Sequence, residues 1–361
     1  MTPSSPPHPR ILIIRPSALG DVCRSVPVLA SLRRAYPQAK IDWLVQDAFA
    51  PAIAAHPALS EVVPFPRKEL ARWYAPSTTP AVRKFLAGLA DHKYDIAIDC
   101  QGLLRSGLFA LATRAHRRIG FDNAQELGWL GLTERIHAPR DLHTVDRMLL
   151  LAEAAGGSSS TTDDDARLYC AAADRAWAES QQSLAGGRFA VIAPTTRWPG
   201  KRWDGSRFAT LAEIMLREGM FGIDKIALVG AASEREQCPE LLALAARDPR
   251  IVDLIGSTTV GQMMALIERS SVLVGCDSAP VHMAVGFGKP MAALYGPTRV
   301  ERVGPYRHSA HVVQRLIPGD VLNHKDEQAG RKLMNRITVD DVLDCLRVQA
   351  SRTEPAAPAR A

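Results

Sequence analysis

Short apolar runs alternate with longer amphipathic segments along most of the chain, and each apolar run has the length of a buried strand. We expect strands at residues 11–14, 41–45, 62–65, 94–99, 119–121, 189–193, 225–229, 251–254, 271–274 and 291–295. Helices are expected between them, at residues 22–36, 49–56, 103–115, 141–155, 204–218, 234–246, 259–269 and 279–286, and after Thr338. This β–α alternation predicts an α/β protein with doubly wound parallel sheets.

The polar segment Gly156 to Asp165, with the sequence GGSSSTTDDD, separates two such series. We therefore predict two Rossmann-like domains in tandem, with ligands bound in a cleft between facing strand ends. The predicted boundaries are a disordered tail at 1–10, an N-terminal domain at 11–170, a C-terminal domain at 171–337, a helix at 338–350 and a disordered tail at 351–361.

Composition limits the classes of binding partner and the cellular compartment that we expect for this chain. The chain has 361 residues, 47% of them hydrophobic, which is enough for two cores. Its net charge of +6 indicates an acidic or phosphorylated partner, without choosing among nucleic acid, an anionic membrane and a nucleotide-sugar. Its 6 cysteines include no CxxC pair, which is typical of reduced thiols in a cytosolic protein. The first ten residues lack the apolar core of a signal peptide and no apolar run would span a bilayer, so we expect any membrane contact to be peripheral.

The stretch Gly275 to Thr298 carries polar groups at the carboxyl end of a predicted strand. Asp277 and Ser278 form a good helix N-cap pair, and His282 follows within the first turns of the helix. Open α/β sheets bind ligands at such ends, and the free N–H groups of a helix start suit a phosphate. The alternative is an ordinary capped helix with a solvated histidine.

Two motifs resemble a known family. Ser17-Ala-Leu-Gly-Asp-Val and Asp277-Ser-Ala-Pro-Val-His are similar to the paired signatures of glycosyltransferase family 9, the ADP-heptose:lipopolysaccharide heptosyltransferases with the GT-B fold. The resemblance covers residues 11–348 and is closest to heptosyltransferase I, on segments 41–45, 94–103, 143–147 and 195–203. Two positions depart from the family: Ala279 replaces the usual Gly beside the donor phosphates, and Gln125 stands where a basic residue is expected.

The resemblance implies an inverting, metal-independent transferase without a cofactor. Asp21 would be the general base for the acceptor hydroxyl, whereas the competing interpretation makes it only the N-cap of helix 22–36. Lys201 would stabilise the departing ADP, with Thr195 and Thr196 on phosphate or sugar oxygens.

The same resemblance extends the donor site along the C-terminal domain. Asp277 would hold heptose hydroxyls, while Ser278, Ala279 and His282 would meet the phosphates at the helix start. Glu234 would bind ribose hydroxyls, although a plain acidic residue in a first helical turn explains it equally well.

The acceptor side is basic. Residues 67–118 contain ten Lys or Arg and four Asp or Glu, which suits a Kdo-lipid A acceptor and an anionic inner-membrane surface, where each basic residue contributes about 1 kcal/mol. The candidate acceptor-binding residues are Ser17, Gly20, Arg67, Lys68, Arg72, Gln101, Arg105, His143 and Arg147. Nucleic acid is the other candidate partner for the basic residues, but no nucleic-acid fold signature is present.

We therefore expect a heptosyltransferase that moves a heptose from ADP-L-glycero-D-manno-heptose to the Kdo/lipid A inner core. It would act as a monomer, cytoplasmic and peripheral on the cytoplasmic face of the inner membrane. The alternatives are a family 9 transferase of another heptose or acceptor, a nucleotide-sugar 2-epimerase, and a non-catalytic sugar-nucleotide-binding protein. The early Gly20-Asp21 turn favours the transferase over the epimerase.

Overall fold

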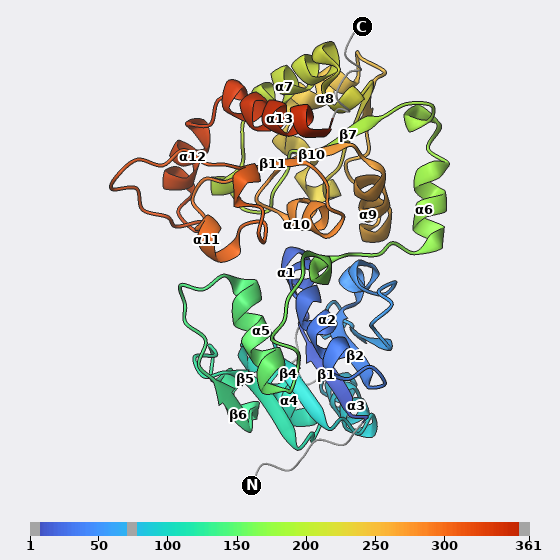
Figure 1. The fold of residues 1–361 in the computed structure, drawn as a ribbon, viewed down its shortest axis with the longest axis vertical. Coiled ribbons are helices and arrows are strands. Elements are labelled where there is room, and N and C mark those ends of the chain that lie inside the picture. Colours follow the sequence, from blue (N-terminus) through green and yellow to red (C-terminus); the bar gives the residue numbers. More distant parts are fainter. Residues whose placement is uncertain (1–7, 71–77, 354–361) are drawn as a thin grey trace, which may run out of the picture. The chain divides into compact units, whose positions relative to one another are not determined.

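The structure is a computed structural model that describes residues 8–70 and 78–353. The chain divides into two compact units, unit 1 (Met1–Tyr169) and unit 2 (Cys170–Ala361). Each unit has one parallel sheet with helices on its faces, as the ribbon in Figure 1 shows.

Unit 1 contains a six-stranded parallel sheet in the order β3-β2-β1-β4-β5-β6. The strands are β1 (Arg10–Ile14), β2 (Lys40–Gln46), β3 (Glu61–Phe65), β4 (Ile96–Asp99), β5 (Arg117–Phe121) and β6 (Glu134–Ile136). Ile11 of β1 pairs with Ile41 on one side and Ile96 on the other. Because helices cover both faces, the central strands are continuous apolar runs, and the strand order reverses between β1 and β4.

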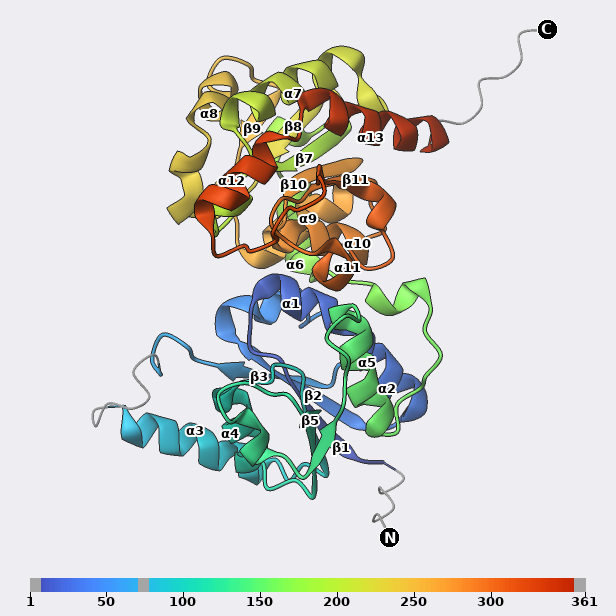
Figure 2. The same cartoon turned by 90° about the vertical axis from the view of Figure 1, so that its left-hand side faces the viewer.

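The helices of unit 1 largely follow the predicted pattern, although the helix predicted at 49–56 is a 3-10 helix that ends at Ala52. They are α1 (Leu19–Arg24), α2 (Val26–Ala35), α3 (Thr79–Asp91), α4 (Leu104–Ala112) and α5 (Thr144–Ala154), with the 3-10 helices η1 (Asp47–Ala52), η2 (Gly128–Gly131) and η3 (Asp163–Ala166). The single helix predicted at 22–36 is wrong: it divides at Ser25, because Pro27 has no N–H to donate to Cys23. Helix α3 was not predicted, and it packs beside α4 (Figure 2).

Unit 2 repeats the same topology. Its strands are β7 (Phe189–Ala193), β8 (Lys225–Leu228), β9 (Ile251–Asp253), β10 (Val272–Cys276), β11 (Met291–Leu294) and β12 (Val312–Val313). They form a parallel sheet in the order β12-β11-β10-β7-β8-β9, so the order reverses between β7 and β10. The ligand edge predicted for a doubly wound sheet is therefore at the carboxyl ends of β7 and β10.

In unit 2, too, a proline interrupts a helix that the hydrophobic periodicity predicts to be continuous. They are α6 (Ala172–Glu179), α7 (Gly205–Glu218), α8 (Pro239–Ala245), α9 (Val260–Arg269), α10 (Ala279–Gly286), α11 (Val300–Val303), α12 (Glu327–Asn335) and α13 (Val339–Thr353), with 3-10 helices η4 (Gln182–Leu184), η5 (Pro199–Lys201), η6 (Met220–Gly222), η7 (Ala232–Gln237) and η8 (Ser309–His311). The helix predicted at 234–246 is wrong, because it is divided into η7 and α8 before Pro239. Helices α6 and α12 were not predicted.

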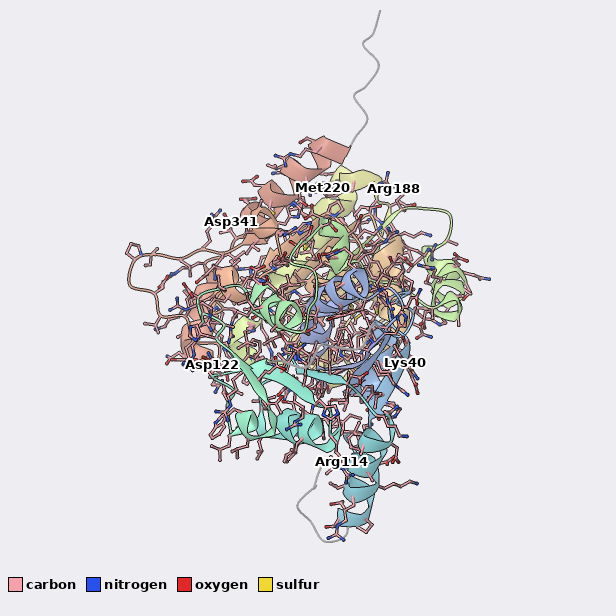
Figure 3. The ribbon with its side chains drawn as sticks, turned by 60° about the horizontal axis from the view of Figure 1, so that its bottom comes forward. Lys40, Arg114, Asp122, Arg188, Met220 and Asp341 are labelled. Atoms are coloured by element: carbon pink, nitrogen blue, oxygen red, sulfur yellow. The ribbon has the colours of Figure 1, made fainter. Side chains whose placement is uncertain are left out.

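Both predicted tails are shorter than expected. Arg10 belongs to β1, where it pairs with Lys40, and residues 351–353 continue helix α13. A reciprocal capping pair begins this helix: Asp341, labelled in Figure 3, accepts the Thr338 N–H at 2.9 Å, and Thr338 Oγ1 accepts the Asp341 N–H at 3.1 Å. Residues 1–7 and 354–361 lie outside the described part of the chain.

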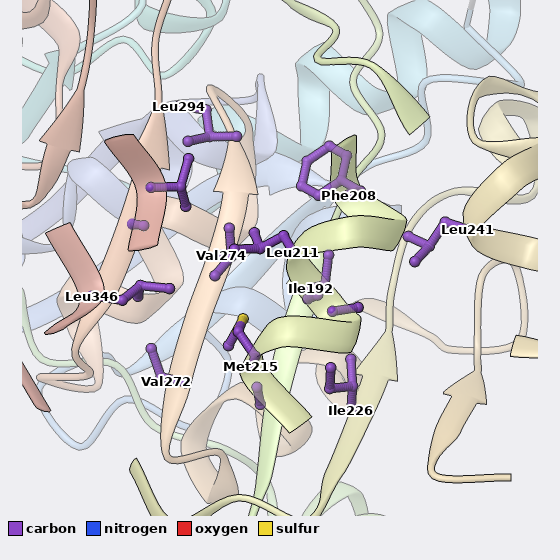
Figure 4. Packing of buried hydrophobic residues seen from close by; sticks show 14 of the residues in the cluster. Ile192, Phe208, Leu211, Met215, Ile226, Leu241, Val272, Val274, Leu294 and Leu346 are labelled. Atoms are coloured by element: carbon purple, nitrogen blue, oxygen red, sulfur yellow. The ribbon is translucent and has the colours of Figure 1, made fainter. Parts of the chain in front are cut away.

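The core of unit 2 forms where α7 packs on the sheet. Phe208, Leu211, Ala212 and Met215 recur at helical spacing and none is exposed. Figure 4 shows Phe208, Leu211 and Met215 against strand residues such as Val274. This packing fixes the strands whose carboxyl ends carry the polar residues.

All six cysteines are free, and five of them are buried, whereas Cys345 is partly exposed. Burial raises the pKa of the Cys23, Cys100 and Cys276 thiols to about 12. The prediction that the thiols are mostly buried is confirmed. Among the described residues, no helix combines the length and apolarity that a membrane span requires.

Replacing Leu211 by Ala should lower the free energy of unfolding of unit 2 by about 2–5 kcal/mol, because it leaves a cavity in a packed core. Chemical denaturation followed by circular dichroism measures the change. Leu316→Ala is the matched control: this leucine is 42% exposed, so its loss should shift stability by only about 0.5 kcal/mol. Equal effects of the two substitutions would contradict the assigned core.

Candidate functional site

The turn after β1 carries the first predicted site residues. The Arg15 N–H donates to the Leu44 carbonyl at 3.1 Å, which continues the sheet pairing by one residue. The Ser17 N–H then donates to Gln101 Oε1 at 3.3 Å, and α1 begins at Leu19. Gly20 and Asp21 therefore lie in the first turn of α1, at the point where the strand order reverses.

Asp21 is held by two guanidinium groups. Arg15 Nη2 is 3.0 Å from Asp21 Oδ2, and Arg24 forms an ion pair with Asp21 Oδ1. Burial on its own would raise the pKa of Asp21, but the charges of Arg15 and Arg24, a hydrogen bond from Arg24 and the Ala18 N–H together lower that pKa well below its usual value. Asp21 is the third residue of α1, so the expectation that it could be the N-cap is wrong. The carboxylate is ionised throughout the neutral range.

A pocket of about 270 Å³ opens beside this turn in unit 1. Four of the predicted acceptor-binding residues line it: Ser17, Arg67, Gln101 and Arg105. The acidic Glu126 also lines the pocket, one residue after Gln125, and was not predicted. The two arginines in its lining make the pocket suitable for an anionic ligand.

The remaining predicted acceptor residues do not line this pocket. Lys68 is exposed on the surface, and Arg72 lies outside the described residues. His143 is the N-cap of α5, where its Nδ1 accepts the Val145 N–H at 3.2 Å. The Arg147 guanidinium lies 4.8 Å from the centre of the Phe121 ring. These contacts give the two α5 residues a part in local structure.

Asp99 at the end of β4 supports the pocket and was not singled out from the sequence. Its Oδ1 accepts the Gln101 N–H at 2.9 Å and the Gly102 N–H at 3.0 Å, and its Oδ2 accepts the Ser106 hydroxyl at 2.9 Å. Complete burial raises the pKa of Asp99 to about 6, against the lowering effect of these donors. The carboxylate thereby fixes the turn that presents Gln101. Its position directly before Cys100-Gln101-Gly102, at a strand end, is the signal that could have identified it.

In unit 2, Lys201 and Asp277 form an ion pair. Lys201 ends η5 after β7, and Asp277 follows β10, where its N–H donates to the Leu294 carbonyl at 3.1 Å. Lys201 Nζ donates to Asp277 Oδ2 at 2.6 Å, and the two side chains are only 13% and 9% exposed. Two loops 76 residues apart thus meet at the edge where the strand order of the second sheet reverses.

Close backbone packing positions Lys201. A Cβ added to Gly330 of α12 would lie 2.5 Å from the Gly200 carbonyl oxygen, so only glycine allows η5 and α12 to approach this closely. His324, in the loop before α12, stacks edge-on against Trp198 with ring centres 5.2 Å apart. Burial, and then the nearby charge of Lys201, lower the pKa of His324. Neither α12 nor His324 was identified from the sequence.

The two threonines after β7 are both buried. Thr195 Oγ1 donates to Glu234 Oε2 at 2.8 Å, which brings together two predicted donor-binding residues. The Thr196 N–H donates to Gln237 Oε1 at 3.1 Å. Gln237 was missed, because a glutamine at the end of a 3-10 helix has no distinctive sequence signal.

Helix α10 starts directly after Asp277. Ser278 occupies the N-cap position with extended backbone, but its hydroxyl donates to the Cys276 carbonyl at 3.1 Å rather than serving as a side-chain cap. Ala279 is the first helical residue, and Pro280 follows without an N–H. His282 is 6% exposed, so the alternative of a solvated histidine is wrong.

The sequence pattern of the family described as glycosyltransferase family 9 (heptosyltransferase) matches residues 82–329. Lipopolysaccharide heptosyltransferase 2 of Escherichia coli K12 is 27% identical over 86% of this chain and 89% of its own. Lipopolysaccharide heptosyltransferase 1 of Pseudomonas aeruginosa is 28% identical over 83% and 82%. Relatives of both types therefore match at nearly the same identity.

Solved structures agree with the fold. E. coli ADP-heptose lps heptosyltransferase II has a TM-score of 0.76 at 25% identity, covering 96% of this chain and all of that chain. E. coli heptosyltransferase WaaC with ADP-2-deoxy-2-fluoro heptose has a TM-score of 0.68 at 25% identity, covering 91% and 99%. The two doubly wound units are those of the GT-B fold. Because the family pattern spans more than half of its residues, the chain belongs to glycosyltransferase family 9, the heptosyltransferases.

Proposed function

We propose that this heptosyltransferase of lipopolysaccharide core biosynthesis takes its sugar from ADP-L-glycero-D-manno-heptose and transfers it to the Kdo/lipid A inner core. The observation that carries the proposal is the ionised Asp21 at the carboxyl end of β1, on a turn whose Ser17 lines an arginine-containing pocket. Family membership supplies the reaction class, and a related enzyme has been solved with an ADP-heptose analogue.

Asp21 is proposed as the base. The acceptor oxygen attacks the anomeric carbon, the bond from that carbon to the diphosphate oxygen breaks, and the hydroxyl proton passes to Asp21. Since its pKa is lowered, Asp21 is always ionised but is a weak base. A hydroxyl becomes strongly acidic once its oxygen bonds to carbon, so a weak base suffices late in the displacement. Direct attack with one carboxylate as base inverts the anomeric centre, by analogy with hydrolases.

The donor side is proposed in unit 2. Lys201 would stabilise the charge that develops on ADP as the glycosidic bond breaks. Thr195, Thr196, Ser278, Ala279 and His282 would surround phosphate or sugar oxygens. Asp277 would accept hydrogen bonds from heptose hydroxyls, and Glu234, which already accepts from Thr195, would bind ribose.

The acceptor side is proposed in unit 1. Arg67 and Arg105 in the pocket suit the phosphates and acidic sugars of the acceptor. Exposed Lys68 and its basic neighbours would hold the enzyme on the cytoplasmic face of the inner membrane as a peripheral monomer. A family 9 transferase of another heptose or acceptor is the second candidate, because relatives of types 1 and 2 match this chain equally well.

The direct test is mass spectrometry of lipid-linked products after incubation with ADP-heptose and a series of truncated acceptors. We expect one added heptose on a Kdo-terminated acceptor. Transfer only to an acceptor that already carries heptose would favour the second candidate. No transfer to any acceptor, with ADP-heptose still bound, would support a non-catalytic binding protein.

Asp21→Asn should lower turnover by roughly 10²–10⁴-fold, the usual contribution of a general base. Binding of ADP-heptose, measured by calorimetry, should stay near the parent value because the donor residues lie in unit 2. Asp91→Asn, at the exposed end of α3, is the control and should leave turnover unchanged. Normal turnover of Asp21→Asn would restrict Asp21 to holding Arg15 and Arg24.

Gly330→Ala should reduce turnover at least tenfold, because the new Cβ would collide with the Gly200 carbonyl and displace Lys201. Steady-state kinetics measures the effect. Gly88→Ala is the matched control, since a Cβ there meets nothing within 4 Å and α3 should gain about 0.5–1 kcal/mol of helix stability. Full activity of Gly330→Ala would show that the η5 position is unimportant.

Replacing Arg67, Lys68 and Arg72 by Ala should weaken binding to anionic vesicles and flatten its salt dependence, because salt screens exposed charges. Vesicle sedimentation across a salt titration measures this. A triple replacement of the exposed Arg217, Arg247 and Arg331 in unit 2 removes the same charge and should bind like the parent. An equal loss of vesicle binding in both triple variants would show that binding depends on net charge alone.

A further inference from the structure

The ion pair between Lys201 and Asp277 sets up a competition for one cation. We propose that Asp277 competes with the diphosphate for Lys201, so that the site binds the intact nucleotide-sugar in preference to the nucleoside diphosphate left after transfer. The proposal rests on the donor site proposed above, and it adds a specificity role for the pair itself.

The pair is nearly shielded from water. Nζ and Oδ2 are 2.6 Å apart, and the side chains are 13% and 9% exposed. In such surroundings a charge that loses its partner is strongly destabilising, far more than at an exposed pair. A diphosphate that draws Lys201 toward itself therefore leaves the Asp277 carboxylate without its cation and beside a new negative charge.

The titratable groups around the pair include His324 and Lys325. Burial, and then the charges of Lys201 and Lys325, lower the pKa of His324, so this imidazole is largely neutral near pH 7. Among the described residues, Lys201 is the ion-pair partner that the structure shows for Asp277. Compensation for the carboxylate must therefore come from the ligand.

A sugar attached to the diphosphate provides that compensation. A carboxylate accepts several hydrogen bonds, and sugar hydroxyls donate them. With the intact donor, Lys201 moves to the diphosphate while hydroxyls satisfy Asp277, so neither charge is left unpaired. With the nucleoside diphosphate alone, only one of the two charges is satisfied.

The same competition assists product release. Transfer forms the bond between the acceptor oxygen and the anomeric carbon, breaks the bond to the diphosphate, and removes the hydroxyls from Asp277. Asp277 then takes Lys201 back, which weakens the hold on the remaining nucleotide. Lys201 keeps its proton throughout.

Calorimetry with ADP and with ADP-heptose on the full chain tests the proposal. Asp277→Asn keeps the side-chain shape but removes the competing charge, so it should bind ADP roughly tenfold more tightly than the parent. Its preference for ADP-heptose over ADP should fall by at least that factor. Product inhibition by ADP should strengthen in parallel, and Asp277→Ser should change ADP affinity in the same direction.

A matched control separates this effect from net charge. Glu268→Gln removes a carboxylate that is paired with Arg175 at 2.7 Å in the same unit, so ADP affinity should stay at the parent value. Unchanged or weaker ADP binding by both Asp277 variants, with normal melting temperatures, would overturn the proposal.

A double-mutant cycle tests whether Lys201 carries the effect. In a Lys201→Ala background, Asp277→Asn should no longer tighten ADP binding. If the tightening persists there, simple repulsion between Asp277 and the diphosphate replaces the competition. Failure of the proposed function is a separate result: a parent chain that binds both ligands with this preference but transfers no heptose would keep the competition and lose the transferase reaction.

Discussion

Strands buried on both faces determine where this protein can place charge. The central strands β1, β4, β7 and β10 contain no exposed residue apart from the first position of β1, which is partly exposed. Charged groups therefore emerge where these strands end, and in both sheets those ends lie next to the reversal of strand order. The ionised groups of the candidate site follow from this constraint, because burial near the strands requires each charge to be paired.

Two carboxylates near the same edge of the unit 1 sheet have pKa values that are shifted in opposite directions. Asp21 faces two guanidinium groups, and its pKa is lowered in spite of burial. Asp99 is buried among N–H and hydroxyl donors, and its pKa is raised to about 6. Desolvation raises the pKa of a buried carboxyl group. The charges of two neighbouring guanidinium groups outweigh this effect at Asp21, whereas the hydrogen-bond donors around Asp99 offset it only in part. One carboxylate is thereby kept ionised, while the other organises a turn.

Much of this arrangement could be predicted from the sequence, because apolar runs and polar strand ends are local patterns. The ten predicted strands all exist, and Ser17, Arg67, Gln101 and Arg105 share a pocket. The predictions that failed depend on other effects. The helix predicted at 22–36 is interrupted before Pro27 because proline has no N–H to donate, and hydrophobic periodicity does not take this into account. The pairing of Lys201 with Asp277 and the contact between Gly200 and Gly330 join segments far apart in the chain, which no local pattern encodes.

The buried cysteines have a practical consequence for spectroscopy. Thiolates are the species that react with maleimides, and the raised thiol pKa values together with burial keep Cys23, Cys100 and Cys276 unreactive at neutral pH. One engineered surface cysteine in each unit would then outcompete the native thiols, once the partly exposed Cys345 is replaced. A donor and an acceptor dye attached there would report by energy transfer whether the distance between the units changes during turnover, without a cysteine-free background.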